Sequence, residues 1–281
     1  MSAKTEIERR LRSLDYKKIS KNLFNKSFDD LSEDEYLDIL KIADIYGSKY
    51  KKIFKLKDTA DIRTITSNLM PKSYSPCFTE HDDLSIISLS KTDTSFIIYL
   101  EFYTLETIWK VEPYGAITHK VPYQEKLRRI MIIEKENLSN YIIVSIDPVG
   151  EGAAVYKKID ENFRKLNDKL NLNFYDFLDM IEVDKALFQL AEEGSLIPKV
   201  VSAIDETTKR VKSVQAHASK DNIKNEDIYK SCITSDLTTG NIKMKFNKES
   251  IEIFGNTLVK ISTNANKGQT DELTTKITSI L

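Results

Sequence analysis

The stretch that decides the fold runs from Ser85 to Asp147 and reads SIISLSKTDTSFIIYLEFYTLETIWKVEPYGAITHKVPYQEKLRRIMIIEKENLSNYIIVSID. Apolar residues alternate along it, as in the series Phe96, Ile98, Leu100 and Phe102, which is typical of strands with one better-buried face. Trp109 and Val111 also share a face, and Tyr114-Gly115 predicts a hairpin turn. About five such runs follow one another with short connections, which favours antiparallel pairing.

The segments on either side of this stretch carry helix signals. Ser32-Glu33-Asp34-Glu35 is a capping box, and the first seventy residues are predicted to be helical. Helices are predicted again from about 153 to 220, including one over 197–218 with apolar residues at helical spacing. The last fifty residues predict three short strands and a terminal helix.

This order of helices, strands, helices and strands predicts an α+β fold rather than a parallel α/β sheet. We expect an N-terminal helical region, a central antiparallel sheet, a helical hairpin and a small C-terminal β-meander with a terminal helix. The predicted regions are 1–70, 71–220 and 221–281, the last being β-rich.

The composition excludes several classes of protein. Of the 281 residues, 41% are hydrophobic, and 42 lysines and arginines balance 43 acids to a net charge of −1. The chain therefore has a packed core and no overall field that attracts nucleic acid or anionic lipid. Cys77 and Cys232 do not form a disulfide framework, and neither a signal peptide nor a membrane span is evident. We expect a cytoplasmic protein without a membrane contact.

Asp147 is the first candidate catalytic residue. It ends a strand-like run and enters Pro148-Val149-Gly150-Glu151-Gly152, just before a predicted helix. Asp147 and Glu151 together could hold a divalent cation, because hard cations prefer carboxylate oxygens. The alternative is that Pro148 and Gly150 shape an ordinary strand-to-helix turn.

A second candidate metal site is Glu80-His81-Asp82-Asp83, close to Cys77. Zinc sites draw on two pairs of ligands, and no second Cys/His pair is evident, so these residues also fit a loop decorated with acids. No nucleotide-binding or hydrolase motif accompanies either candidate.

The basic stretch 49–57 is the candidate nucleic-acid contact. Its five lysines, Lys49, Lys51, Lys52, Lys55 and Lys57, are interleaved with aromatic residues, which suits phosphate contacts with stacking. The alternative is a solvated helix face with Tyr50, Ile53 and Phe54 on its buried side.

Two functions remain after this reading. The first is a non-enzymatic binding or assembly protein that works through its surfaces, without a cofactor, with a protein partner or a second copy, and of phage or mobile-element origin. The alternative is a metal-dependent nuclease or phosphotransfer enzyme centred on Asp147, with a divalent cation. Whether the chain is an enzyme stays open, and missing motifs favour the first function.

Overall fold

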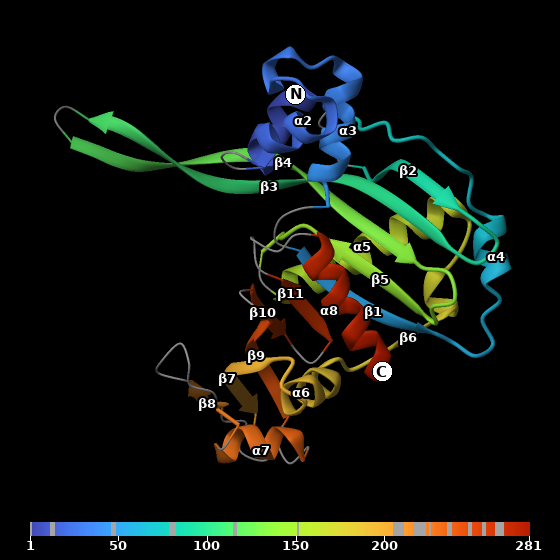
Figure 1. The fold of residues 1–281 in the computed structure, drawn as a ribbon, viewed down its shortest axis with the longest axis vertical. Coiled ribbons are helices and arrows are strands. Elements are labelled where there is room, and N and C mark those ends of the chain that lie inside the picture. Colours follow the sequence, from blue (N-terminus) through green and yellow to red (C-terminus); the bar gives the residue numbers. More distant parts are fainter. Residues whose placement is uncertain are drawn as a thin grey trace.

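The computed structural model confirms the α+β fold class, with helices at both ends of the chain and a large antiparallel sheet. The described residues are 2–11, 15–45, 49–78, 83–114, 117–150, 152–204, 211–215, 223–224, 226–234, 238–246, 249–254, 257–261 and 267–281. Figure 1 shows the N-terminal helices beside a long β-hairpin and the last helix against the sheet.

The helices of the described residues are short, apart from α5 and α8. They are α1 (Ala3–Arg10), α2 (Asp15–Phe24), α3 (Glu33–Ala43), α4 (Ile62–Ser67), α5 (Gly152–Leu170), α6 (Asp184–Glu192), α7 (Asp227–Ile233) and α8 (Lys267–Ile280), with 3₁₀ turns η1 (Phe28–Asp30) and η2 (Phe174–Asp176). The predicted capping box is confirmed at the start of α3, where Ser32 Oγ accepts from the Glu35 N–H and Glu35 Oε2 accepts from the Ser32 N–H.

The strands form one continuous sheet. They are β1 (Lys49–Leu56), β2 (Ser85–Lys91), β3 (Phe96–Tyr114), β4 (Ile117–Lys135), β5 (Tyr141–Ile146), β6 (Leu178–Met180), β7 (Ile197–Ile204), β8 (Val211–Gln215), β9 (Thr238–Phe246), β10 (Glu249–Phe254) and β11 (Leu258–Ile261). Their order is β2-β3-β4-β5-β1-β11-β10-β9-β7-β8, and β6 pairs with β1. The predicted C-terminal meander is β9-β10-β11, and it joins the central strands where β11 pairs with β1.

The two faces of the sheet have different covers. On one face, Val155, Ile159 and Phe163 of α5 pack with Ile98 and Val144 in a fully buried core. On the other face, the N-terminal helices lie over β3 and β4, while α8 and α6 lie over β1 and the meander. The α5 core and the α8 core are therefore on opposite sides of the same strands.

Two segments that were predicted to be helical are strands. Residues 49–56 form β1 in the middle of the sheet, and residues 197–204 and 211–215 form β7 and β8. The apolar residues of the second segment are mostly valine and isoleucine, which pack well on a pleated surface, and here strand pairing outweighed their helical spacing. The first part of the expected helical hairpin is thus helical, as α5 and the shorter α6, whereas its second part consists of the strands β7 and β8. Residues 178–180, also expected to continue a helix, form β6.

The β3–β4 hairpin is longer than the other pairings of the described strands. Its register runs without a break from Phe96 opposite Lys135 to Tyr114 opposite Ile117. The inner half lies within the sheet, whereas the outer half leaves the body as a two-stranded ribbon (Figure 1). We call residues 105–114 and 117–126 the arm.

Candidate functional site

Charged side chains gather in a buried cluster where the N-terminal helices meet the sheet. The cluster consists of Glu6, Arg10, Asp44, Lys49, Glu101, Arg128 and Asp147. They come from α1, the end of α3, β1, β3, β4 and the end of β5, so the tertiary fold brings together groups that are far apart in the sequence. Opposite charges alternate in the cluster, which is the condition for burying them.

Arg128 lies at the centre of this cluster and is completely buried. Its Nη1 and Nη2 donate to the two carboxylate oxygens of Asp44 at 2.8 and 3.0 Å, and its Nε donates to Glu101 Oε2 at 2.8 Å. Tyr74 adds a hydrogen bond from its hydroxyl to Asp44 Oδ2 at 2.7 Å. The planar guanidinium thus joins a helix end to two strands with fixed geometry.

Asp147 belongs to the same cluster and already receives donors on both carboxylate oxygens. Oδ2 accepts from Arg10 Nη2 and from the Ile130 N–H, each at 2.7 Å, while Oδ1 accepts from Lys49 Nζ. Burial alone would raise the pKa of Asp147, but the charges of Arg10 and Lys49 outweigh it and hold that pKa well below its ordinary value. A metal ion at this carboxylate would have to displace those donors.

The backbone conformation and packing of the turn after Asp147 explain why Gly150 is a glycine. Gly150 has φ of 114°, and a Cβ at this position would lie 3.2 Å from the Cβ of Ala154 in the first turn of α5. The Gly150 carbonyl accepts a hydrogen bond from the Tyr50 hydroxyl at 3.3 Å. The glycine therefore allows the close approach of β5 and α5. Glu151, the expected partner of Asp147, lies outside the described residues.

The second predicted metal site is described only at one end. Glu80, His81 and Asp82 lie outside the described residues, while Asp83 pairs with Lys169 at 2.7 Å and accepts from the Leu84 N–H. Among the described residues, no three histidine, cysteine, aspartate or glutamate side chains are grouped as they would be around a metal ion.

The lysines of 49–57 are mostly buried, because this segment is a central strand. Lys49 binds Asp147, Lys51 Nζ donates to Thr274 Oγ1 at 3.0 Å, and Lys52 Nζ lies 5.0 Å from the ring centres of Phe54 and Tyr156. Lys57 Nζ donates to two backbone carbonyls, and Lys55 is exposed. The structure therefore places one of these five lysines, Lys55, fully at the surface.

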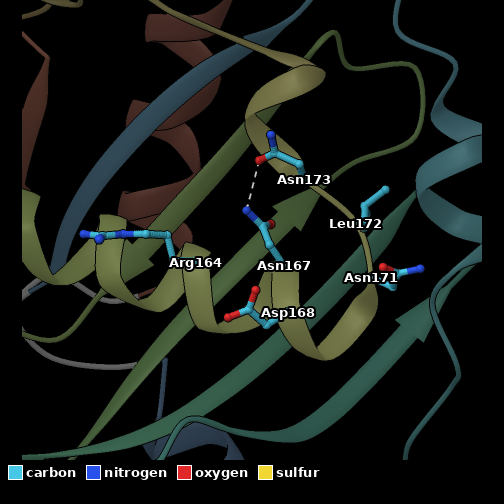
Figure 2. Close-up of a pocket in the computed structure, with 6 residues that line it drawn as sticks. All are labelled: Arg164, Asn167, Asp168, Asn171, Leu172 and Asn173. Carbon is cyan, nitrogen blue, oxygen red and sulfur yellow. Dashed lines mark hydrogen bonds between the residues drawn. The ribbon is translucent and has the colours of Figure 1, made fainter.

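A polar hollow lies at the end of α5 (Figure 2). It has a volume of about 610 Å³ and is lined by Arg164, Asn167, Asp168, Asn171, Leu172 and Asn173. Asn167 holds the turn, since its Nδ2 donates to Asn173 Oδ1 at 3.0 Å and its Oδ1 accepts from the Phe174 N–H at 3.1 Å. The amides are thus used to end the helix, where Asn171 takes a left-handed conformation with φ of 49°.

A smaller cavity, of about 140 Å³, lies between the N-terminal helices, the sheet and α8. Its lining contains charged residues of both signs, which are Lys49, Lys51, Glu134 and Asp271. The other lining residues are Ile45, Ile97, Tyr99, Ile132 and Ser145. This volume accommodates about four or five water molecules with polar partners.

The arm carries an apolar row on one of its two faces. Leu105, Trp109 and Val111 are 65%, 63% and 63% exposed, and Pro122 lies directly opposite Trp109. Alternate residues of a strand share a face, so these four side chains lie along the same side of the ribbon. Lys120 and Lys126, opposite Val111 and Leu105, are on this face too, and none of its described residues is acidic.

The other face of the arm pairs its charges with one another and also carries Ile108, Val121 and Tyr123. Glu106 binds Arg129 at 2.5 Å, Glu125 lies 3.9 Å from Lys110, and Glu112 accepts from the Tyr123 hydroxyl. Lys110 also lies 5.1 Å from the centre of the Tyr123 ring. The apolar row is the more exposed of the two faces, because Leu105, Trp109 and Val111 are 63–65% exposed whereas Ile108 and Val121 are half-buried.

Sequence reasoning missed the ion cluster and the exposure of the arm. The sequence does contain a signal for the cluster, namely a charged residue on a strand face that is otherwise apolar. Arg128 shares its face of β4 with Ile130 and Ile132, and Glu101 shares its face of β3 with Tyr99. A charge at the buried position of an alternating strand requires a partner.

Comparison with models of protein families finds no match, and a search of curated proteins finds no relative of this sequence. No helix among the described residues is long and apolar enough to cross a membrane.

Proposed function

We propose that this chain is a non-enzymatic assembly protein that binds a second copy of itself through the apolar row of the arm. One observation carries the proposal: Leu105, Trp109 and Val111 are mostly exposed on one face of a ribbon that projects from the body. Tryptophan is enriched among the residues that dominate binding energy, and an exposed apolar row on a projecting ribbon is typical of an interaction surface.

The shape of the arm supports this function. A two-stranded ribbon has marginal stability by itself in water, and it gains from packing against another surface. The arm points away from the body in Figure 1, so the outer part of the row needs another chain to cover it. Covering three such side chains contributes on the order of 5–9 kcal/mol. Association costs a similar amount of free energy, because the two chains lose translational and rotational freedom. A single arm contact is therefore weak, and more than one contact per chain is needed.

The charges of the arm favour a protein partner over nucleic acid. Its described residues contain the acids Glu106, Glu112 and Glu125 and the bases Lys110, Lys120 and Lys126. Nucleic-acid surfaces need an excess of cations along the contact, which a balanced arm does not supply. The engagement of Asp147 by Arg10 and Lys49 further supports a non-enzymatic role over a metal-dependent nuclease. A cytoplasmic location and a phage or mobile-element origin are parts of the same proposal, the first supported by Cys77 and Cys232, whose sulfurs are not joined in a disulfide.

Light scattering coupled to size exclusion tests the proposal. The wild-type chain is expected to form a defined oligomer or a concentration-dependent assembly, and Trp109→Ser/Val111→Ser to have the mass of one chain. Met70→Ser/Leu23→Ser is the matched control, because Met70 and Leu23 are 82% and 52% exposed and lie outside the arm. A wild-type mass of one chain at all concentrations would contradict the proposal. A mass that shifts with a DNA duplex, followed by cleavage in Mg²⁺, would support the function centred on Asp147 instead.

A further inference from the structure

We infer that the cavity between the N-terminal helices, the sheet and α8 binds a small α-amino acid with an uncharged side chain, as its zwitterion. This site is separate from the arm and goes beyond the proposed function. The cavity has a volume of about 140 Å³. Since a protein cavity of about 150 Å³ holds benzene, this volume suits a compact ligand such as glycine, alanine or serine.

The sheet side of the cavity is one row of side chains that crosses four neighbouring strands. Tyr99 of β3 lies opposite Ile132 of β4, which in turn lies opposite Ser145 of β5. Ser145 lies opposite Lys51 of β1, and all four residues line the cavity. Paired residues of adjacent strands share a face of the sheet, so the two hydroxyls and the amine of this row border the same space.

Tyr99 is a buried polar residue whose hydroxyl is left unsatisfied within the described part of the chain. Tyr99 is 9% exposed, and its hydroxyl has no hydrogen-bond partner among the described residues. The half-buried Ser145 hydroxyl has none among them either. The large majority of buried polar side-chain atoms are hydrogen-bonded, and a buried tyrosine usually places its hydroxyl on a partner. Two such hydroxyls on one cavity therefore indicate a polar occupant.

The same row supplies hydrogen-bond donors for a carboxylate. Burial, together with the charges of Glu134 and Asp44, raises the pKa of Tyr99 to about 12, so its hydroxyl is protonated and can donate at neutral pH. The buried Lys51 donates to Thr274 Oγ1 at 3.0 Å, and an ammonium with three protons can hold more than one acceptor. A carboxylate on this row would thus receive charge-assisted hydrogen bonds.

The lining also contains carboxylates that suit an ammonium group. Glu134 of β4 and Asp271 of α8 are half-buried, whereas Lys51 and Lys49 are buried and Lys49 is bound to Asp147. A carboxylate has about four lone-pair sites, so Glu134 and Asp271 can accept from a ligand beside their contacts within the chain. An anion alone would face these carboxylates, and a cation alone would face Lys51. A ligand with both charges matches the lining better than either.

Apolar surface completes the cavity and restricts the side chain of the ligand. Ile45, which follows α3, and Ile97 and Ile132 of the sheet are the remaining lining residues. They offer no partner for a third charged group, so a short aliphatic or hydroxyl side chain fits better than an acidic or basic one.

Isothermal titration calorimetry tests the inference with probes that differ in charge. L-Alanine carries both charges, propionate only the carboxylate, and ethylamine only the ammonium. We expect L-alanine to bind at one site per chain, and propionate and ethylamine to bind at least about tenfold more weakly. Glycine and L-serine should also bind, whereas L-tryptophan is too large for the cavity and should not.

Variants of the lining locate the binding. Tyr99→Phe keeps the ring and removes the hydroxyl, so the dissociation constant of L-alanine should rise by at least about tenfold. Tyr141→Phe is the matched control, because Tyr141 is half-buried on β5 and lies outside the lining. Glu134→Gln/Asp271→Asn should remove the preference for L-alanine over propionate. The exposed Glu136→Gln is its control.

Three results would overturn the inference. If glycine, L-alanine and L-serine give no heat of binding, the cavity holds water only. If propionate or ethylamine binds the wild type as tightly as L-alanine, the cavity is a site for an anion or a cation instead. If Tyr99→Phe is folded by circular dichroism and binds L-alanine like the wild type, the binding lies elsewhere. None of these measurements depends on assembly, so a wild-type chain that stays a monomer would remove the proposed function and leave this inference in place.

Discussion

Arg128 and Asp44 form a bidentate ion pair between β4 and the end of α3, with nitrogen–oxygen distances of 2.8 and 3.0 Å and no exposure of either side chain. The two residues are 84 positions apart in the sequence, and their ion pair joins the N-terminal helices to the sheet. A buried pair of this kind contributes little to stability as a whole compared with an apolar pair, whereas removal of one partner leaves a buried charge uncompensated.

We therefore expect Asp44→Asn to lower the free energy of unfolding by about 3–5 kcal/mol. Urea denaturation followed by far-ultraviolet circular dichroism measures this change. Asp29→Asn is the control, because Asp29 forms an exposed pair with Lys4 at 2.6 Å and should show little effect. Equal stabilities of the two variants would contradict the structural role of the cluster.

Asp147→Asn separates the structural role of this residue from a catalytic one. Removing the carboxylate leaves Arg10 and Lys49 without their shared partner, so we expect a loss of about 3–5 kcal/mol at neutral pH. A catalytic Asp147 would instead show a lost metal-dependent activity with a nearly unchanged melting temperature.

The same variant makes a prediction for pH. The pKa of Asp147 is lower in the folded chain than its ordinary value of 3.8, so its contribution to stability is complete above that value and is lost as the pH falls toward the folded pKa. The stability difference between the wild type and Asp147→Asn should thus be constant near neutrality and shrink below about pH 4. A stability difference that grows as the pH falls would contradict the predicted direction of the pKa shift of Asp147.

Trp109 offers a direct probe of the arm, since it is the single tryptophan of the chain and is 63% exposed. Its fluorescence should resemble that of a solvent-exposed indole in dilute protein and shift to shorter wavelength as the concentration rises, because docking removes water from the ring. Salt should reverse part of the shift if charges help docking, since screening lengths fall from about 10 Å at 0.1 M to about 3 Å at 1 M. An emission spectrum independent of concentration, in samples whose mass increases, would place the contact elsewhere.

The lysines of β1 should affect stability rather than nucleic-acid binding. Lys51→Gln/Lys52→Gln removes the hydrogen bond to Thr274 and the contacts with the Phe54 and Tyr156 rings. We expect a loss of about 1–2 kcal/mol in urea denaturation. Lys55→Gln, at the exposed end of the strand, is the matched control and should stay within about 0.5 kcal/mol of the wild type. A salt-dependent binding to DNA that weakens in Lys55→Gln would revive the nucleic-acid prediction.

The sequence predicted much of the fold where the signals are local. The capping box at Ser32 and Glu35, the alternation from Phe96 to Phe102 and the C-terminal meander all depend on spacings of two to four residues. Prediction was wrong for 49–56, because five lysines in nine residues concealed a central strand. It was also wrong for 197–204 and 211–215, where β-branched residues at helical spacing fit two patterns and the choice depends on strand pairing, as between β7 and β9.

The sequence by itself determined the α+β class and, for the strands that it predicted, which residues share a face, since both follow from local periodicity. Only the tertiary structure decided what covers each side. It buried Arg128 against Asp44 and Asp147 against Arg10 and Lys49, and it left Trp109 and Val111 exposed on a ribbon beyond the body. The physical reason is that burial and charge pairing depend on segments distant in the chain, whereas alternation specifies only which residues share a face.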